Sequence, residues 1–492
     1  MEVSMFLNLK QFAVFSCDSD MIQAAVDAAE NTGEAVLIPR INPRTGTPGY
    51  EISKTVFLPN FCTVYLHNCT LRLADGAVCS IFRSKNMLLP DSLNEKNRQN
   101  GITINGIGEA VLDGGKHNGI YEHNGIARKV MKPSPYPPSE NCMMSFRNVE
   151  NMTIRGITVR NHRYWGILFL YCSHCRISDI NFESAGNVPN QDGLDICRGC
   201  HDFIVENITG CTGDNLIALC GLGRSETTLT GDVYNISVRN VIGHGVGGNA
   251  LIRLLNHDGN KLYNISIDTV IENSPWSDDD APVAPNPDLL IKTDDEGNIL
   301  PWKRVAPGEF GYRLESLIQI GESYWFSHSK ASHGDTYGIS VRNVMTHARF
   351  AVIINNTLTD SYFENIRLFG NGFMAFHFGE GRVENIQIRD ICYDHDCHPL
   401  PTDEHIFVDW NNTRSDGFHC IGFHNTQVRG LHINGIACLN YGKQMTSVIG
   451  GTGSGALDIT DVHCESIPKL STAEGLDILW TDSAGKQKDR MH

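Results

Sequence analysis

A short pattern of apolar positions recurs along most of the chain: apolar, any residue, apolar, two residues, apolar. Each copy alternates apolar and polar residues and is rich in Val, Ile and Thr, which is typical of β-strands. The copies lie mostly 20 to 33 residues apart. Matching the second apolar residue of each copy gives Ile154, Ile177, Val205, Val238, Ile267, Val341, Leu368, Ile388, Ile433 and Ile459.

This period predicts a solenoid, because the intervals leave no room for a helix plus a second strand. Coils of such a solenoid stack roughly 4.8 Å apart, so the matched apolar positions become an inward ladder. A propeller is disfavoured, since the repeat is too short for four strands per blade. We therefore predict an all-β fold, a single-stranded right-handed parallel β-helix.

The amino-terminal residues predict a cap for that solenoid. Asp18-Ser19-Asp20 precedes the alanine-rich amphipathic run 21–29, which ends before Gly33, so capping signals stand at both ends of a helix. Such a helix would cover the open edge of the first coil. We predict a single domain over 1–492, organised as a cap with first coils (1–145), coils carrying the candidate site (146–270), an inserted loop region (271–337), carboxy-terminal coils (338–470) and a cap or tail (471–492).

Composition narrows the range of partners. The 492 residues hold 40 Lys and Arg against 56 Asp and Glu, a net charge of −16. This balance argues against a nucleic-acid or anionic-membrane partner that needs a basic face. The amino terminus lacks a basic region followed by an apolar run, and no membrane-spanning run appears. We expect a cytoplasmic protein whose 16 cysteines are buried and reduced. A homo-oligomer is compatible with the sequence.

Two neighbouring coils carry acidic residues that suggest chemistry. Asp192 and Asp214 are 22 residues apart, one coil, so stacking places both carboxylates on one face. Two such groups can divide into a proton donor and an ionised base, the arrangement that cleaves glycosidic bonds. The alternative is that β-helix corners collect Asn, Asp and Gly simply to make turns.

The segment from about Met143 to Leu255 resembles the glycoside hydrolases of family 28, the polygalacturonase type. The resemblance is carried by His162-Arg163-Tyr164-Trp165-Gly166-Ile167, Asn190-Gln191-Asp192-Gly193-Leu194-Asp195, Gly213-Asp214-Asn215, Gly243-His244-Gly245 and Arg253. It implies that Asp214 is the general acid and that Asp192 activates water. It also implies inversion of configuration, although adjacent coils could bring the two carboxylates to about 5 Å, the separation usual for retaining enzymes.

The other candidate residues follow from the same resemblance. Asn190 and Gln191 fall on substrate-binding positions, with Gln191 replacing a small residue. His244 falls on a histidine that would tune the acid, or is a solvated corner residue between two glycines. Asp195 is an alternative second carboxylate, or a structural residue.

Two departures from the family pattern bear on the substrate. Asn215 replaces a second base carboxylate and cannot ionise. Arg253 stands without the lysine of the family's Arg-x-Lys pair, which grips a uronate carboxylate. A neutral sugar, or a differently attached uronate, is therefore a plausible substrate.

Two further motifs have structural alternatives. The spacing of Cys172-x-x-Cys175 and Cys197-x-x-Cys200 matches a zinc ribbon. The two motifs, however, occupy the same place in successive coils, which favours inward ladders of cysteines. We therefore expect no metal and no cofactor. The aromatic segment 322–328 suits sugar stacking or a buried cluster.

The sequence thus favours an exo-acting glycosidase of plant-derived oligosaccharides, pectin-related or other, within cell wall polysaccharide degradation. The alternatives are a polysaccharide lyase on the same fold, with calcium ligands such as Asp278-Asp279-Asp280, and a non-catalytic carbohydrate-binding β-helix, for which Asn215 is the main argument.

Overall fold

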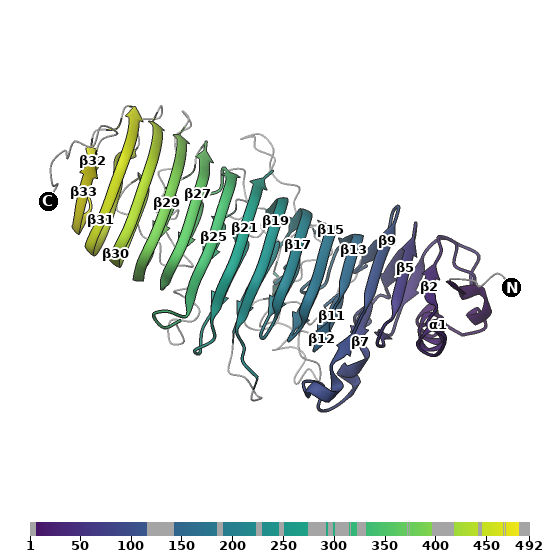
Figure 1. The fold of residues 1–492 in the computed structure, drawn as a ribbon. Helices are drawn as coiled ribbons and strands as arrows, with labels where there is room; N and C mark the ends of the chain where they lie inside the picture. The colour runs from purple at the N-terminus through teal and green to yellow at the C-terminus, as the bar shows by residue number, and fades with distance from the viewer. Residues whose placement is uncertain are drawn as a thin grey trace. The chain divides into compact units, whose positions relative to one another are not determined.

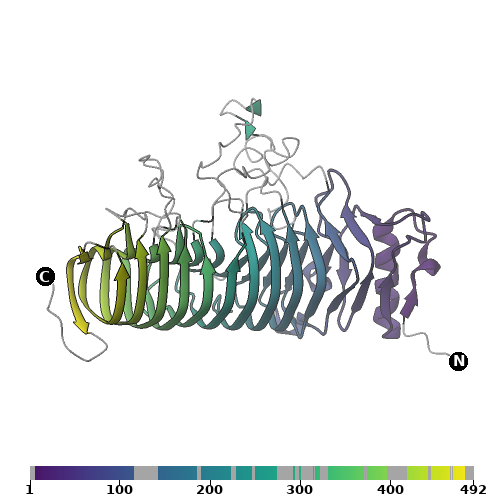
Figure 2. The same cartoon turned by 90° about the horizontal axis from the view of Figure 1, so that it is seen from above.

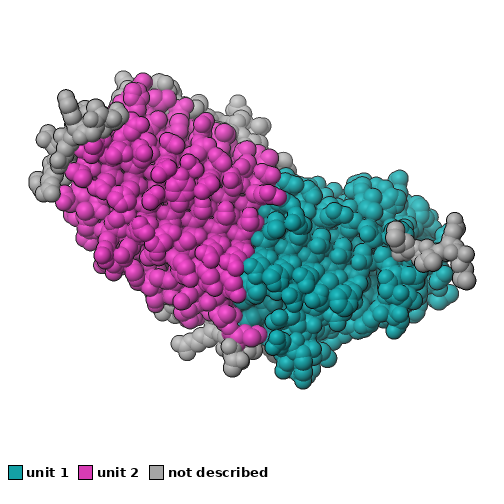
Figure 3. Space-filling view, in the orientation of Figure 1, with its two compact units in different colours: residues 1–218, 245–247, 279–307 teal, residues 219–244, 248–278, 308–492 magenta. Residues whose placement is uncertain are grey.

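A computed structural model describes most of the chain in two compact units (Figure 3). Unit 1 comprises residues 1–218, 245–247 and 279–307, and unit 2 comprises residues 219–244, 248–278 and 308–492. The prediction of one domain over 1–492 stays a prediction. The described residues are 6–115, 142–184, 190–222, 229–245, 250–273, 292–293, 299–300, 314, 316–321, 331–370, 372, 374–395, 418–440, 445–465, 467 and 469–481.

Unit 1 is a stack of parallel strands that begins with the only α-helix among the described residues (Figures 1 and 2). Its elements are β1 (Phe6–Asn8), η1 (Leu9–Phe12), α1 (Asp18–Thr32), β2 (Ala35–Ile38), β3 (Tyr50–Ile52), β4 (Val56–Leu58), β5 (Thr63–His67), β6 (Thr70–Leu73), β7 (Phe82–Ser84), η2 (Lys85–Leu88), η3 (Glu95–Asn97), β8 (Gln99–Asn100), β9 (Thr103–Ile107), β10 (Val111–Asp113), β11 (Met144–Arg147), β12 (Val149–Glu150), β13 (Thr153–Arg160), β14 (Ile167–Leu170), β15 (Ser173–Glu183), β16 (Leu194–Cys197), β17 (His201–Thr212) and the antiparallel pair β22 (Lys292–Thr293) and β23 (Ile299–Leu300). Strand β18 (Ile217–Gly221) begins in this unit.

Unit 2 continues the same kind of parallel ladder. Its strands are β19 (Val233–Gly245), β20 (Ala250–Asn256), β21 (Leu262–Glu272), β24 (Ser316–Ile320), β25 (Thr336–Thr346), β26 (Phe350–Ile354), β27 (Leu358–Phe369), β28 (Met374–Phe378), β29 (Gly381–His395), β30 (Phe418–Asn440), β31 (Met445–Glu465), β32 (Lys469–Ser471) and β33 (Glu474–Thr481). Strand β33 pairs in parallel with β31, so the ladder reaches Thr481. Most of the inserted region 271–337 lies outside the described residues.

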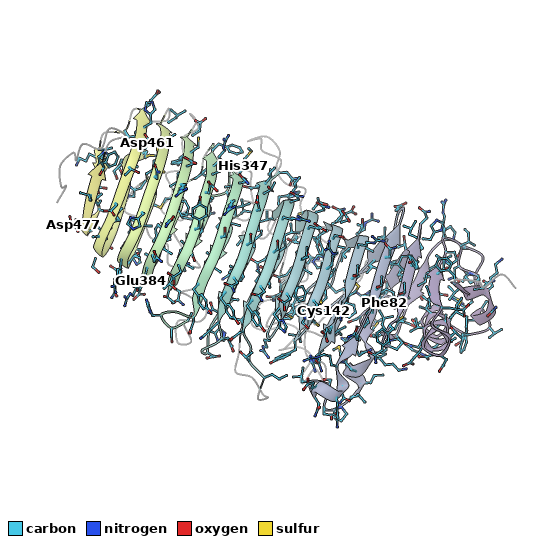
Figure 4. All side chains as sticks on the ribbon, in the orientation of Figure 1. Phe82, Cys142, His347, Glu384, Asp461 and Asp477 are labelled. Atoms are coloured by element: carbon cyan, nitrogen blue, oxygen red, sulfur yellow. The ribbon has the colours of Figure 1, made fainter. Side chains whose placement is uncertain are left out.

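The predicted apolar ladder is present in both units. In unit 1, Val64, Ile104, Ile154, Ile177 and Val205 stand in register on successive strands and are all buried. Phe82, labelled in Figure 4, is likewise buried in this core.

In unit 2 one predicted ladder position is wrong. The register runs Val341, Phe363, Ile388, Ile433, Ile459, so Phe363 rather than Leu368 occupies the position. Leu368 stands in register with Thr346 instead, because the apolar pattern recurs twice along the long strand β27. The sequence pattern alone does not distinguish the two copies.

The capping helix is confirmed, but two of its expected caps have another role. The helix begins at Asp18, and the Asp18 carboxylate accepts from the Asn42 amide (2.8 Å) and the Glu51 N–H (2.8 Å). The Ser19 hydroxyl accepts from backbone N–H groups of the segment after β3. These side chains therefore fasten the helix to the first coils. At the other end Gly33 takes a left-handed conformation and closes the helix as predicted.

No helix among the described residues is both long and apolar enough to cross a bilayer.

Candidate functional site

The candidate site lies in unit 1, where successive coils turn into β14, β16 and β18. The Gly166 N–H donates to the Asp192 carbonyl (2.8 Å), and the Gly193 N–H donates to the Asn215 carbonyl (2.9 Å). In a parallel ladder the N–H of a residue donates to the carbonyl of the residue that precedes its register partner. For example, Ile167 is in register with Leu194, and its N–H donates to the Gly193 carbonyl. By this rule Gly193 is in register with Leu216, whereas the Asp214 N–H donates to the Gln191 carbonyl (3.2 Å) and so sets Asp214 beside Asp192. Asp214 and Asn215 thus both lie opposite Asp192.

The Asn215 side chain joins the two predicted carboxylates. Its Nδ2 donates to Asp192 Oδ1 (2.7 Å) and to Asp214 Oδ1 (2.8 Å). The Asn215 backbone N–H also donates to Asp214 Oδ1 (2.9 Å). Both hydrogen bonds come from the same nitrogen atom, so the distance between the two accepting oxygens cannot exceed the sum of the two bond lengths. The structure brings Asp192 and Asp214 together as predicted, with a neutral amide between them.

The two carboxylates differ in their access to solvent. Asp192 is only 4% exposed, whereas Asp214 is half-buried. The Thr212 hydroxyl donates to the Asp214 carbonyl (2.8 Å) and fixes the backbone that carries this side chain. Asp214 is therefore the carboxyl group better placed to touch a bound molecule, while Asp192 is almost completely buried.

Glycine allows the coils to approach closely at this corner. A Cβ on Gly193 would lie 2.6 Å from the Leu216 carbonyl oxygen and 3.1 Å from the Phe182 ring. A Cβ on Gly166 would lie 2.5 Å from the Gly193 carbonyl oxygen. Since real side chains are not found at such distances from a backbone oxygen, the position of Asp192 depends on Gly193 having none.

Gln191 and Asn190 occupy the loop before Asp192. Gln191 is fully buried, and its Nε2 donates to the His162 carbonyl (2.7 Å), so it braces the loop in this structure. Asn190 is half-buried and takes a left-handed backbone conformation, which asparagine tolerates better than most residues. Their predicted part in substrate binding stays a prediction.

His162 is a residue of the site whose role sequence reasoning missed. It is fully buried, and its Nδ1 lies 2.9 Å from the Ser184 hydroxyl. Burial lowers the pKa of His162 to about 4, although hydrogen bonds to the backbone of Gln191 and Asp192 act in the opposite direction. The neutral imidazole thus supports the loop that carries Asp192. The sequence offered only the presence of a histidine inside the segment that resembles family 28. No periodic pattern marks this position as buried.

The remaining candidates have other surroundings. Asp195 is buried on β16, in register with Leu168 of β14. His244 and Arg253 belong to unit 2. His244 Nδ1 lies 3.0 Å from Asn273 Oδ1, and Arg253 Nη1 lies 3.4 Å from Gln319 Oε1.

Unit 2 contains a buried carboxylate of its own at the ends of β21 and β25. Glu272 Oε2 accepts from the Thr346 hydroxyl and from the His347 N–H (3.1 Å). His347, labelled in Figure 4, has its Nε2 3.9 Å from Glu272 Oε1. The sequence pattern gave no indication of this group.

The cysteine motifs do not stack as whole units. Cys172 is in register with Cys200, whose sulfur accepts from the Cys172 N–H (3.4 Å), but Cys197 stands beside Leu170 and Cys175 beside Phe203. The predicted ladders, with Cys172 over Cys197 and Cys175 over Cys200, are therefore wrong, because the coils differ by 27 or 28 residues here and not by 25. Within the described ranges no three His, Cys, Asp or Glu side chains are grouped to hold a metal ion. The segments 278–280 and 322–328 lie outside those ranges.

Comparison with known proteins supports the resemblance seen in the motifs. The sequence profile of glycosyl hydrolases family 28 matches residues 84–272, which include Asp192, Asp214, Asn215, His244 and Arg253. An exopolygalacturonase of Arabidopsis thaliana is 25% identical over 161 residues, which are 32% of this chain and 34% of that protein. An exopolygalacturonase of Zea mays is 28% identical over 153 residues, 30% of this chain and 35% of that protein. The chain thus spans about a third of the length of these relatives.

A solved structure supports the fold. The tailspike protein of E. coli bacteriophage HK620, a mutant form, superposes with a TM-score of 0.54 at 12% identity, covering 97% of this chain and 80% of that one. Together with the parallel ladders, this likeness confirms the predicted right-handed parallel β-helix with an amino-terminal capping helix. The family 28 resemblance is confirmed for the segment that carries the motifs.

Proposed function

We propose that this protein is a glycoside hydrolase that releases monosaccharides from the ends of plant-derived oligosaccharides, pectin-related or other. The observation that carries the proposal is the pair of carboxylates, Asp192 and Asp214, joined by the Asn215 amide inside the family 28 segment. Exo action is supported by the names of the two plant relatives. A short, uncharged substrate fits the departure at Arg253.

In the proposed mechanism Asp214 donates a proton to the leaving glycosidic oxygen. Two carboxylates this close disfavour both being ionised, so one proton is retained between them. Asp214 is the more exposed of the two and is the one that a glycosidic oxygen can reach.

Asp192 then acts as the base that takes a proton from water. The resemblance implies inversion, in which that water attacks the anomeric carbon. The short carboxylate separation is nearer the about 5–5.5 Å of retaining enzymes than the about 6.5–9.5 Å of inverting ones. We nevertheless favour inversion, because a nucleophile must touch the anomeric carbon and Asp192 is almost completely buried. Proton NMR of the first-formed anomer tests this choice: a product of unchanged configuration would contradict it.

Four further roles rest on the resemblance alone. We propose that His244 tunes the acid, that Arg253 and Asn190 bind substrate, and that Asp195 is a subsidiary carboxylate. Gln191 is proposed to act on substrate through the loop that it braces.

The activity is tested by incubating the wild-type chain and Asp214→Asn with a panel of pectic and neutral oligosaccharides. The expected result is monosaccharide release by the wild type without unsaturated product, and a loss of about 10³-fold in the variant. Unsaturated products would indicate a lyase. Sugar binding without release in both proteins would indicate a non-catalytic β-helix.

A further inference from the structure

Two aromatic side chains stand at the corner just before β14, beside the candidate carboxylates in the ladder. The rings of Tyr164 and Trp165 lie 4.8 Å apart between centroids and are tilted by 41°. Both side chains are half-buried, unlike the core aromatics Phe146 and Phe169 of the neighbouring strands, which are fully buried. The pair therefore forms an edge of unit 1 that solvent reaches, outside the apolar ladder.

The register places Trp165 in one row with the catalytic candidates. The Gly166 N–H donates to the Asp192 carbonyl, which extends the register of β14 and β16 back by one residue and sets Trp165 beside Asp192. On the next coil Asp214 and Asn215 lie opposite Asp192. Successive coils lie roughly 4.8 Å apart, so Trp165 is one coil from Asp192 on the same corner. Asp214 is on the following coil, so an oligosaccharide that contacts both Trp165 and Asp214 spans two coils, roughly 10 Å.

The backbone that carries the aromatic pair is held firmly. Arg163 is fully buried and donates from Nε to the Gly114 carbonyl (2.6 Å) and from its Nη atoms to the carbonyls of Ala74 and Ala77. The backbone carbonyl of Trp165 itself accepts from the Met143 N–H (3.2 Å). A ring on so rigid a support loses little conformational freedom when a ligand packs on it.

We propose that Trp165, backed by Tyr164, forms a stacking subsite for a pyranose ring adjacent to the bond that is cleaved. An indole presents a broad apolar face with few rotatable bonds, and the C–H face of a sugar ring packs on such a surface. The subsite recognises the shape of the ring rather than a charge. This inference rests on the proposed function, since it assigns the ring a place beside the proposed acid and base.

The test measures oligosaccharide affinity in the Asp214→Asn background, so that binding is read without turnover. The ligand is the oligosaccharide of the panel that the wild type cleaves best. Its affinity is measured by calorimetric titration for Asp214→Asn alone and for Asp214→Asn combined with Trp165→Ala or with Trp165→Phe. We expect affinity to fall about tenfold with Trp165→Ala and about twofold with Trp165→Phe, which keeps an aromatic face. Phe61→Ala, which removes an exposed aromatic from an earlier coil, should leave affinity unchanged.

Kinetics of the otherwise wild-type chain give a second readout. Trp165→Ala should raise KM with little change in kcat if the subsite binds ground state and transition state alike. Unchanged affinity, or a fall in kcat and in thermal stability without a change in affinity, would overturn the subsite. If the wild type neither binds nor cleaves any sugar of the panel, the proposed function itself fails, which is a different result.

Discussion

Two corners of the molecule bury carboxylates, and they do so in different ways. In unit 1, Asp192 and Asp214 share the amide of Asn215, and Asp214 is only half-buried. In unit 2, Glu272 has a fully buried side chain whose Oε2 accepts from Thr346 and His347. Burial of a carboxylate is therefore common to both corners. The distinguishing features are the second carboxylate and its access to solvent.

The largest difference should appear when one carboxylate of each corner is neutralised. We expect Asp192→Asn to lower kcat by about 10³-fold with a small change in melting temperature, because it removes the proposed base. Glu272→Gln should instead lower the free energy of unfolding by about 1–2 kcal/mol, because the hydrogen bonds from Thr346 and His347 then end on a neutral amide oxygen in place of a charged carboxylate, and leave kcat within a few-fold. Steady-state kinetics and thermal melts of both variants check this contrast. Equal effects of the two variants on kcat would contradict the difference between the two corners.

The close approach of coils at the first corner predicts a strong effect of one methyl group. Gly193→Ala should destabilise the chain by about 1–3 kcal/mol and displace Asp192, because the new Cβ meets the Leu216 carbonyl oxygen. Gly221→Ala is the matched control, since its Cβ would meet nothing nearer than 3.3 Å. Urea unfolding and kcat of both variants give the measurement. A Gly193→Ala protein as stable and active as the control would show that the corner is looser than described.

Each unit also contains a buried neutral histidine, which predicts acid sensitivity in both. Burial lowers the pKa of His162 to about 4 and that of His377 to about 3, from an ordinary value of 6.5. Above pH 6.5 both histidines are neutral in the folded chain and in the unfolded chain. As the pH falls below 6.5 the unfolded chain takes up the protons first, so stability present above 6.5 is lost progressively down to about pH 4 for His162 and pH 3 for His377.

The loss should approach about 1.4 kcal/mol per pH unit for each histidine. Urea unfolding between pH 7.5 and 4.5 measures the slope, and His162→Asn and His377→Asn should each reduce it. A slope unchanged in both variants would contradict the buried neutral state.

The smallest expected effect concerns the bridge itself. Asn215→Asp restores the residue type of the family pattern but replaces an amide donor by a third carboxylate beside Asp192 and Asp214. We expect kcat to change by less than about tenfold and the pH optimum to move upward, because added negative charge favours the protonated acid. Asn215→Ala, which removes the donor without adding charge, is the control. A pH optimum that moves equally in both variants would show that charge is not the cause.

Much of the fold followed from the sequence, since the alternation that makes a strand also makes a ladder. Ile154, Ile177 and Val205 stack as predicted. The mistake in the ladder arose on the long strand β27, where Phe363 and not Leu368 occupies the predicted position. Coil length is set by corner geometry, which apolar spacing does not record.

The carboxylates of the site were predicted, but their connection was not. The amide of Asn215 was interpreted as a lost charge, whereas in the structure it donates to both neighbours. His162 was missed because a buried polar support has no periodic signal. Both follow from side-chain contacts between coils, which depend on the register.

The central claim is that Asp214 supplies the proton to the leaving group, and the dependence on leaving group tests it most directly. Rates of wild type and Asp214→Asn are compared on the oligosaccharide cleaved by the wild type and on a dinitrophenyl glycoside of the same sugar, whose leaving group departs without protonation. We predict a fall of about 10³-fold on the oligosaccharide and a fall of less than about tenfold on the dinitrophenyl glycoside. Equal losses on both substrates, or no loss on either, would contradict the assignment of Asp214 as the acid.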